Sequence, residues 1–132
     1  MITLDTSAMI AAIDQTDAHH DEVIAVAEQE TGPIVLPVPI LAEITYLIER
    51  TIGARMVEDF LATVIQGDFA LDCCEQDFPR ALALVARYRD LPLGYADASV
   101  IACAERRGGK VLTLDRRHFG VVEREGTIQV LP

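Results

Sequence analysis

The sequence contains little of what marks secreted or disulfide-bonded proteins. It has only three cysteines in 132 residues, and two of them, Cys73 and Cys74, are adjacent. An odd number with this spacing is no disulfide framework, and the absence of a Cys-x-x-Cys pair disfavours a thiolate zinc site. We therefore expect all three cysteines, including Cys103 in an apolar run, to pack in the interior.

Long hydrophobic runs are absent as well. The most apolar stretch, residues 34–42, is interrupted by Pro37 and Pro39 and is far shorter than the roughly 20 residues of a membrane-spanning helix. The N-terminal MITLD reaches an acidic residue at once, which disfavours a signal peptide. With 51% hydrophobic and 24% charged residues, the sequence predicts a cytoplasmic globular protein with a single domain over residues 1–132.

Basic residues are missing from the first 49 positions. The formal net charge is −10, which argues against a nucleic-acid partner, but all eleven Lys and Arg residues lie from Arg50 onward. Eight of them fall in residues 80–117, where there are only four acids. The C-terminal half could therefore present a basic surface, although solvated helix faces would explain the same pattern.

Short apolar runs alternate with segments of helical periodicity along the chain. Strands are predicted at 1–4, 34–37, 69–73, 111–114 and 127–131. Helices are predicted between them, at 6–13, 17–30, 39–51, 54–65, 75–88 and 95–107. This alternation predicts an α/β protein with a mainly parallel sheet of about five strands and helices on both faces. Ligands of such folds bind beyond the carboxyl ends of the strands.

Two aspartates stand at that position. Asp5 follows the first predicted strand in ITLD, and Asp115 follows the fourth in VLTLD. Each alone is most often a turn or cap residue. Together, at the carboxyl ends of two strands, they indicate a site.

Two further acids interrupt the apolar faces of predicted helices. Glu43 lies three residues after Ile40 and four before Leu47, on an apolar stripe, and Asp97 occupies the same kind of position in a later helix. A carboxylate that faces the core is costly unless it is paired or binds a metal. Two alternatives remain: a rotated helix would place Glu43 at its edge, and Asp97 could cap a helix that begins at Ala98.

Four carboxylates in one cleft would repel one another unless they shared a cation. Mg²⁺ and Mn²⁺ suit a set of oxygen ligands without Cys or His. A metal of this kind can orient a phosphate, activate a water and stabilise a leaving oxygen. The acids therefore favour phosphodiester hydrolysis; they are Asp5, Glu43, Asp97 and Asp115.

Four segments together resemble the PIN-domain family and, within it, the VapC-type toxins of prokaryotic toxin–antitoxin pairs. These segments are LDTSAMIA, PVPILAEITYLI, LPLGYADASVIACAERRGG and VLTLDRRHF. The resemblance implies a three-layer α/β/α fold and a Mg²⁺- or Mn²⁺-dependent endoribonuclease. It implies Asp5 and Asp97 as the principal metal ligands. Glu43 and Asp115 would then hold metal-bound waters or a second ion.

The resemblance also implies roles for residues beside these acids. Three hydroxyl residues are expected to hydrogen-bond them: Thr6, Ser7 and Thr113. Some relatives carry a further acid shortly after the last aspartate, where this chain has Arg116, Arg117 and His118. This departure does not support a second tightly held ion. The two arginines could grip the RNA backbone, and His118 is expected in a structural turn.

Partners are implied by the same resemblance: an RNA substrate, a second copy of the chain in a homodimer, and a small VapB-like antitoxin that would insert a basic side chain near the acids. Four apolar residues of the helices 39–51 and 54–66 could line its groove or pack in the core: Tyr46, Met56, Phe60 and Val64. Two other functions stay open. One is a metal-dependent nuclease or phosphatase with a non-RNA substrate, and the other is a catalytically silent binding module.

Overall fold

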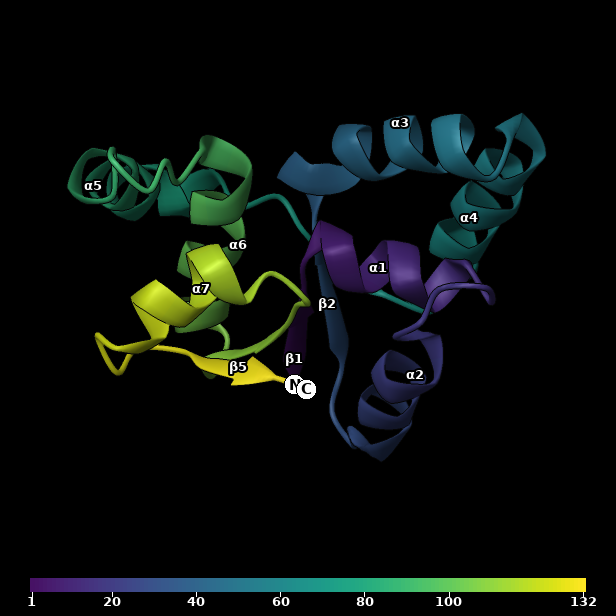
Figure 1. Cartoon of the computed structure of the whole chain (residues 1–132), viewed down its shortest axis with the longest axis horizontal. Coiled ribbons are helices and arrows are strands. Elements are labelled where there is room, and N and C mark those ends of the chain that lie inside the picture. Colours follow the sequence, from purple (N-terminus) through teal and green to yellow (C-terminus); the bar gives the residue numbers. More distant parts are fainter.

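A five-stranded parallel sheet forms the centre of the computed structural model, which describes all 132 residues (Figure 1). Its strands are β1 (Ile2–Leu4), β2 (Ile34–Pro37), β3 (Ala70–Asp72), β4 (Lys110–Leu112) and β5 (Gln129–Leu131). They lie in the order β3-β2-β1-β4-β5, and every neighbouring pair is parallel. After β1 the chain first adds strands on one side and then on the other, so the strand order reverses between β1 and β4.

Helices cover both faces of this sheet (Figure 1). On one side lie α1 (Thr6–Ile13), α2 (His20–Gln29), α3 (Leu41–Thr51) and α4 (Ala54–Gln66). On the other lie α5 (Phe78–Arg87), α6 (Tyr95–Arg106) and α7 (Arg116–Glu123). Short 3-10 turns, η1 (Val38–Ile40) and η2 (Glu75–Asp77), precede α3 and α5. The predicted three-layer α/β/α fold is confirmed, and no helix combines the length and apolar character needed to cross a lipid bilayer.

Helix α6 is the most deeply buried of the seven. Its residues Ala98–Ala104 are all buried, because this stretch is small or apolar on every side. It packs against β1, β2 and β4 and against α5 and α7. A helix enclosed in this way moves little, so the acid in its first turn, Asp97, has a fixed position.

Two local expectations are wrong. Residues 116–123 form helix α7, which was not predicted; it is only eight residues long, and only Phe119 and Val122 are buried in it. Cys74 and Cys103 are buried as expected, but Cys73 is exposed. It follows β3, which is an edge strand with one side open to solvent.

The buried hydroxyl of Thr3 allows a test of how an unpaired polar group affects the stability of the core. Thr3 lies in β1 with its Oγ1 buried and without a hydrogen-bond partner. Valine has nearly the same shape and no polar atom to desolvate. We expect Thr3→Val to raise the free energy of unfolding in urea by about 1 kcal/mol.

The matched control is Thr113→Val. The Thr113 hydroxyl is also buried, but it donates to the Asp5 carboxylate at 2.8 Å. Its removal leaves a buried acceptor short of a donor, so we expect this variant to be less stable than the wild type. Equal losses in both variants would show that the Thr3 hydroxyl has a partner.

Candidate active site

Strands β1 and β4 bring two of the predicted site segments together. Leu4 is paired with Leu112, and the backbone N–H of Asp5 donates to the Leu112 carbonyl at 3.0 Å. Asp5 and Thr113 therefore leave the sheet side by side at its carboxyl edge. Because the strand order reverses here, this edge is the place where ligands of α/β proteins usually bind, and we call it the β1–β4 crevice.

The Asp5 carboxylate is buried and held by two hydroxyl groups. Ser7 Oγ and Thr113 Oγ1 each donate to Asp5 Oδ2 at 2.8 Å. Burial raises the pKa of Asp5, while these hydroxyls and the backbone N–H groups of Thr6 and Ser7 oppose the rise. Thr6 thus acts through its backbone. All side-chain contacts use Oδ2, so Oδ1 is available to a ligand.

The same hydroxyls connect Asp5 to the segment that carries Asp115. Ser7 Oγ and Thr113 Oγ1 lie 3.2 Å apart. Ser7 Oγ accepts from the backbone N–H of Leu114 at 2.9 Å, and Thr113 Oγ1 accepts from that of Asp115 at 3.0 Å. These contacts fix the start of α1 relative to the end of β4, and with it the separation of the two acids.

Asp97 and Asp115 meet a third titratable residue, His118. One potential ligand atom from each of the three lies within 4.8 Å of the others. Asp97 is the third residue of α6, whose N-cap is Gly94, so the alternative that Asp97 caps the helix is wrong. His118 lies in the first turn of α7 rather than in a turn between elements, and its Nδ1 is 2.8 Å from Asp115 Oδ2.

The carboxylates interact electrostatically at Asp97. The pKa of Asp97 is raised to about 6 by burial and, to a smaller extent, by the charges of Asp5, Asp115 and Glu43, whereas His118 opposes the rise. The other three predicted acids are therefore close enough to Asp97 to affect its ionisation. A bound divalent cation would relieve their repulsion, and its preferred ligands are oxygens of this kind.

Glu43 does not face the core, contrary to the expectation from its spacing. It is exposed in the first turn of α3, whose buried residues are Ile44 and Ile48. Moving an unpaired carboxylate into the core would remove its hydration at a large cost in free energy. The helix is therefore rotated so that Glu43 stays in contact with solvent. Among the acids that raise the pKa of Asp97, Glu43 has the smallest effect.

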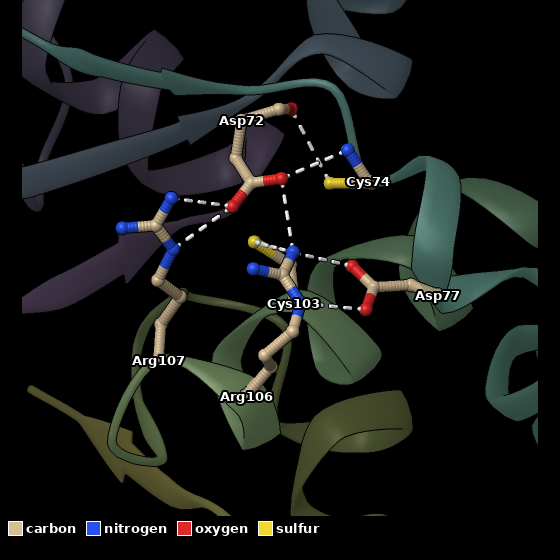
Figure 2. Close-up of polar contacts among 6 residues, drawn as sticks. All are labelled: Asp72, Cys74, Asp77, Cys103, Arg106 and Arg107. Carbon is tan, nitrogen blue, oxygen red and sulfur yellow. Dashed lines mark hydrogen bonds and ion pairs between the residues drawn. The ribbon is translucent and has the colours of Figure 1, made fainter.

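Most basic residues of the C-terminal half are paired with acids, so the predicted basic surface is largely neutralised. Arg106 and Arg107 both contact Asp72 (Figure 2). The other pairs are Arg80–Glu105, Arg80–Glu125, Arg87–Glu125 and Lys110–Glu30. Arg116 and Arg117 are exposed and pair with no acid; Arg116 donates to the C-terminal Pro132 carbonyl.

A second group of potential metal ligands lies elsewhere, beyond β3 (Figure 2). It consists of Asp72, Cys74, Asp77 and Cys103, all buried. Arg106 donates to both acids at 2.8–2.9 Å. Its guanidinium already supplies the positive charge that a cation would bring. A hydrogen bond with Cys103 and burial raise the pKa of the Cys74 thiol, which disfavours the thiolate that would bind a metal. This cluster therefore ties β3 to α6, and the acids at the β1–β4 crevice are the better cation site.

The fold agrees with that of a known family. The PIN domain family matches residues 2–125, and the chain belongs to this family. Ribonuclease VapC26 of Mycobacterium tuberculosis (strain ATCC 25618 / H37Rv) is 31% identical over 121 residues, which are 90% of each chain. The assignment made from the sequence motifs is confirmed.

Solved structures share the whole fold. Mycobacterium tuberculosis VapC20, described as a sarcin–ricin loop cleaving toxin, gives a TM-score of 0.82 at 19% identity and covers 100% of both chains. VapBC2 from Rickettsia felis, bound to a DNA fragment from its promoter, gives a TM-score of 0.72 at 16% identity, over 98% of this chain and 97% of that one. Likeness at this level of identity concerns the fold.

The repulsion at Asp97 predicts a gain in stability when its charge is removed. Because folding raises the pKa of Asp97 from 3.8 to about 6, the folded protein binds this proton more tightly than the unfolded chain. Stability therefore falls as pH rises from about 4 to about 6. At neutral pH and without metal, we expect the free energy of unfolding of Asp97→Asn in urea to exceed that of the wild type by about 1 kcal/mol, after allowance for solvent screening.

This gain should vanish below about pH 4, where the wild-type carboxyl is protonated in both states. Asp68→Asn is the control, since Asp68 is exposed and makes no hydrogen bond or ion pair. Equal stability of Asp97→Asn and wild type at neutral pH, in the presence of EDTA, would contradict the electrostatic description of the site.

Proposed function

We propose that this protein is a Mg²⁺- or Mn²⁺-dependent endoribonuclease and the toxin of a VapBC-type toxin–antitoxin pair. The observation that carries the proposal is the approach of Asp97 to Asp115 within 4.8 Å, with the charges of Asp5, Asp115 and Glu43 all acting on Asp97. The chain belongs to the PIN domain family and is 31% identical to a ribonuclease, which supports RNA as the substrate. Under this proposal the protein acts in the cytoplasm, where its RNA substrate would be.

The donor set fits a hard divalent ion, because it is made of carboxylate oxygens that repel one another without one. Asp5, through its unengaged Oδ1, and Asp97 would hold the ion, and Asp115 and Glu43 would orient its waters. A bound ion would activate a water and stabilise the leaving oxygen in an in-line displacement that leaves 5′-phosphate and 3′-hydroxyl ends.

The chain's own residues hold this arrangement in place. Ser7 and Thr113 fix the orientation of Asp5 through its Oδ2. Arg116 and Arg117 follow Asp115 directly, are exposed and have no acidic side chain as a partner. Arg117 could bind phosphate groups of the RNA as it stands, and Arg116 could do so by exchanging its contact with the Pro132 carbonyl. Contacts of this kind position a nucleic acid without reading its sequence.

A catalytically silent binding module would have no use for these acids. Folding raises the pKa of Asp97, which means that its ionised form lowers stability at neutral pH. A silent module would gain stability from an amide or an apolar residue at this position. The retained carboxylates therefore favour an enzyme.

An antitoxin partner is supported by structural relatives that are VapBC or toxin–antitoxin complexes. Of the four apolar residues that could line its groove or pack in the core, only Tyr46 is exposed; Phe60 is buried, and Met56 and Val64 pack against the core. Leu61 and Ile65 of α4 are exposed as well. We place the antitoxin on this face of α3 and α4, from which a basic side chain could reach the acids.

A homodimer would cover a separate apolar area on α5 and α6. Phe78 and Tyr95 are both exposed, and their rings stack with centroids 5.8 Å apart. Leu82, one turn further along α5, is 71% exposed. Apolar side chains grouped in this way on a protein surface mark an interaction site.

Nuclease activity is tested with a mixed pool of RNA. We expect cleavage with Mg²⁺ or Mn²⁺ and none in EDTA. Ser7→Ala should lower the rate by about 10–100-fold, as is usual for residues that orient a metal ligand, and Asp5→Asn and Asp97→Asn should lower it further. Asp68→Asn should match the wild type, because Asp68 lies in the connection from α4 to β3.

Equal residual cutting by the wild type and both aspartate variants would identify a contaminant and reject the proposal. Parallel assays on single-stranded DNA and on a phosphate monoester separate the alternative enzymes. Faster turnover of either compound than of RNA would assign the site to a DNA nuclease or a phosphatase.

The dimer is tested by sedimentation equilibrium. We expect the wild type to be a dimer at micromolar concentration and Leu82→Glu to be a monomer, because a buried unpaired carboxylate opposes association. Ile65→Glu is the control, since Ile65 is 85% exposed on α4 and lies outside the proposed dimer area. A monomeric wild type, or a dimer broken only by Ile65→Glu, would show that α5 and α6 are not the interface.

A further inference from the structure

We propose that His118 is a nitrogen ligand of the active-site ion and gives the site a preference for Mn²⁺ over Mg²⁺. The inference rests on the proposed function, and it adds a ligand that the four acids do not include. Its basis is the position of His118, which brings a ring nitrogen within 4.8 Å of carboxylate oxygens of Asp97 and Asp115.

The position of His118 is fixed by two bonds to one carboxylate. Asp115 is the N-cap of α7, and its Oδ1 accepts from the backbone N–H of His118 at 3.0 Å. The His118 Nδ1 lies 2.8 Å from Asp115 Oδ2, and the side chain is 20% exposed. The backbone bond sets the start of the helix, and the ring bond sets the direction in which the imidazole points.

This arrangement turns one ring nitrogen, Nδ1, toward the acids. When the ring proton is on Nε2, the neutral ring keeps its lone pair on Nδ1. An ion among the acids can then become the partner of this lone pair, because one potential ligand atom each of Asp97, Asp115 and His118 lies within 4.8 Å of the others. The ring is only partly exposed, so it is held beside the acids rather than extended into solvent.

The other candidates for a nitrogen ligand are excluded by their contacts. His20 directs its Nδ1 to the Ala11 carbonyl at 2.8 Å, and His19 is exposed beside Glu22. No arginine forms an ion pair with Asp97 or Asp115, in contrast to the cluster around Arg106. His118 is therefore the one nitrogen base placed among the crevice acids.

A nitrogen ligand changes which ion the site prefers. Carboxylates and water suit Mg²⁺ and Mn²⁺ alike, but imidazole binds first-row transition ions better than it binds Mg²⁺. We expect the ratio of Mn²⁺ to Mg²⁺ affinity to fall by about tenfold or more when the imidazole is replaced by an oxygen ligand. His118→Asp makes this replacement and keeps the backbone N–H that Asp115 caps.

The experiment uses Mn²⁺ as the probe and does not depend on RNA cleavage. Pulsed electron paramagnetic resonance of the full-length protein with bound Mn²⁺ detects coupling to a ligating nitrogen. Calorimetric titrations with Mn²⁺ and with Mg²⁺ give the two affinities. We expect nitrogen coupling in the wild type and in the control His20→Gln, and neither coupling nor the Mn²⁺ preference in His118→Asp.

The outcomes separate this inference from the proposed function. Mn²⁺ bound by the wild type without nitrogen coupling overturns the role of His118 and leaves the carboxylate site intact. Coupling that persists in His118→Asp overturns it as well, because another nitrogen is then the ligand. A wild type that binds neither ion overturns both the inference and the metal-dependent function.

Discussion

Repulsion among carboxylates at the carboxyl edge of β1 and β4 is the constraint on which the rest of the site depends. Asp5, Asp97 and Asp115 come from three segments that are far apart in the sequence, and burial together with mutual repulsion raises the pKa of Asp97 to about 6. Carboxylates that repel one another move apart unless rigid elements hold them in place. Asp5 is held by the β1–β4 pairing and two hydroxyls, Asp97 by a helix with seven consecutive buried residues, and Asp115 by its contacts at the start of α7.

The two groups of potential metal ligands differ in how the charge of their acids is balanced. Asp72 and Asp77 are satisfied by Arg106, and Arg107 adds a second guanidinium to Asp72, so their charges are balanced within the fold (Figure 2). This balance lowers the pKa of Asp72 against the effect of its burial. The crevice acids have hydroxyls and one imidazole as partners but no arginine. Their negative charge is left for a group from outside the chain.

The sequence was sufficient to predict the fold class and the positions of Asp5 and Asp115 beyond the carboxyl ends of β1 and β4, because the alternation of strands and helices determines which residues follow each strand. It was not sufficient for Glu43: neighbouring positions on a helix differ by about 100°, and spacing alone does not say which edge faces the core. It also failed for the arginines, since Arg106 reaches an acid 34 residues away. The Asp115–His118 contact spans three residues, and the capping pattern of a helix start could have revealed it.

An acidic protein repels RNA, so RNA binding requires a local region of positive electrostatic potential. The formal net charge of −10 opposes the general attraction to phosphate groups on which nonspecific nucleic-acid binding depends. Five of the eight basic residues between Arg80 and Arg117 are occupied by acids, which leaves little basic surface elsewhere. Under the proposed function, the bound cation and the arginines beside Asp115 would supply favourable charge for RNA at the site itself, while the other arginines without an acidic partner lie elsewhere in the chain; they are Arg50, Arg55, Arg89 and Arg124. The excess of acids opposes nonspecific contacts with a long RNA, so affinity would come mainly from contacts at the site. The charge distribution thus favours a narrow choice of target over general degradation of RNA.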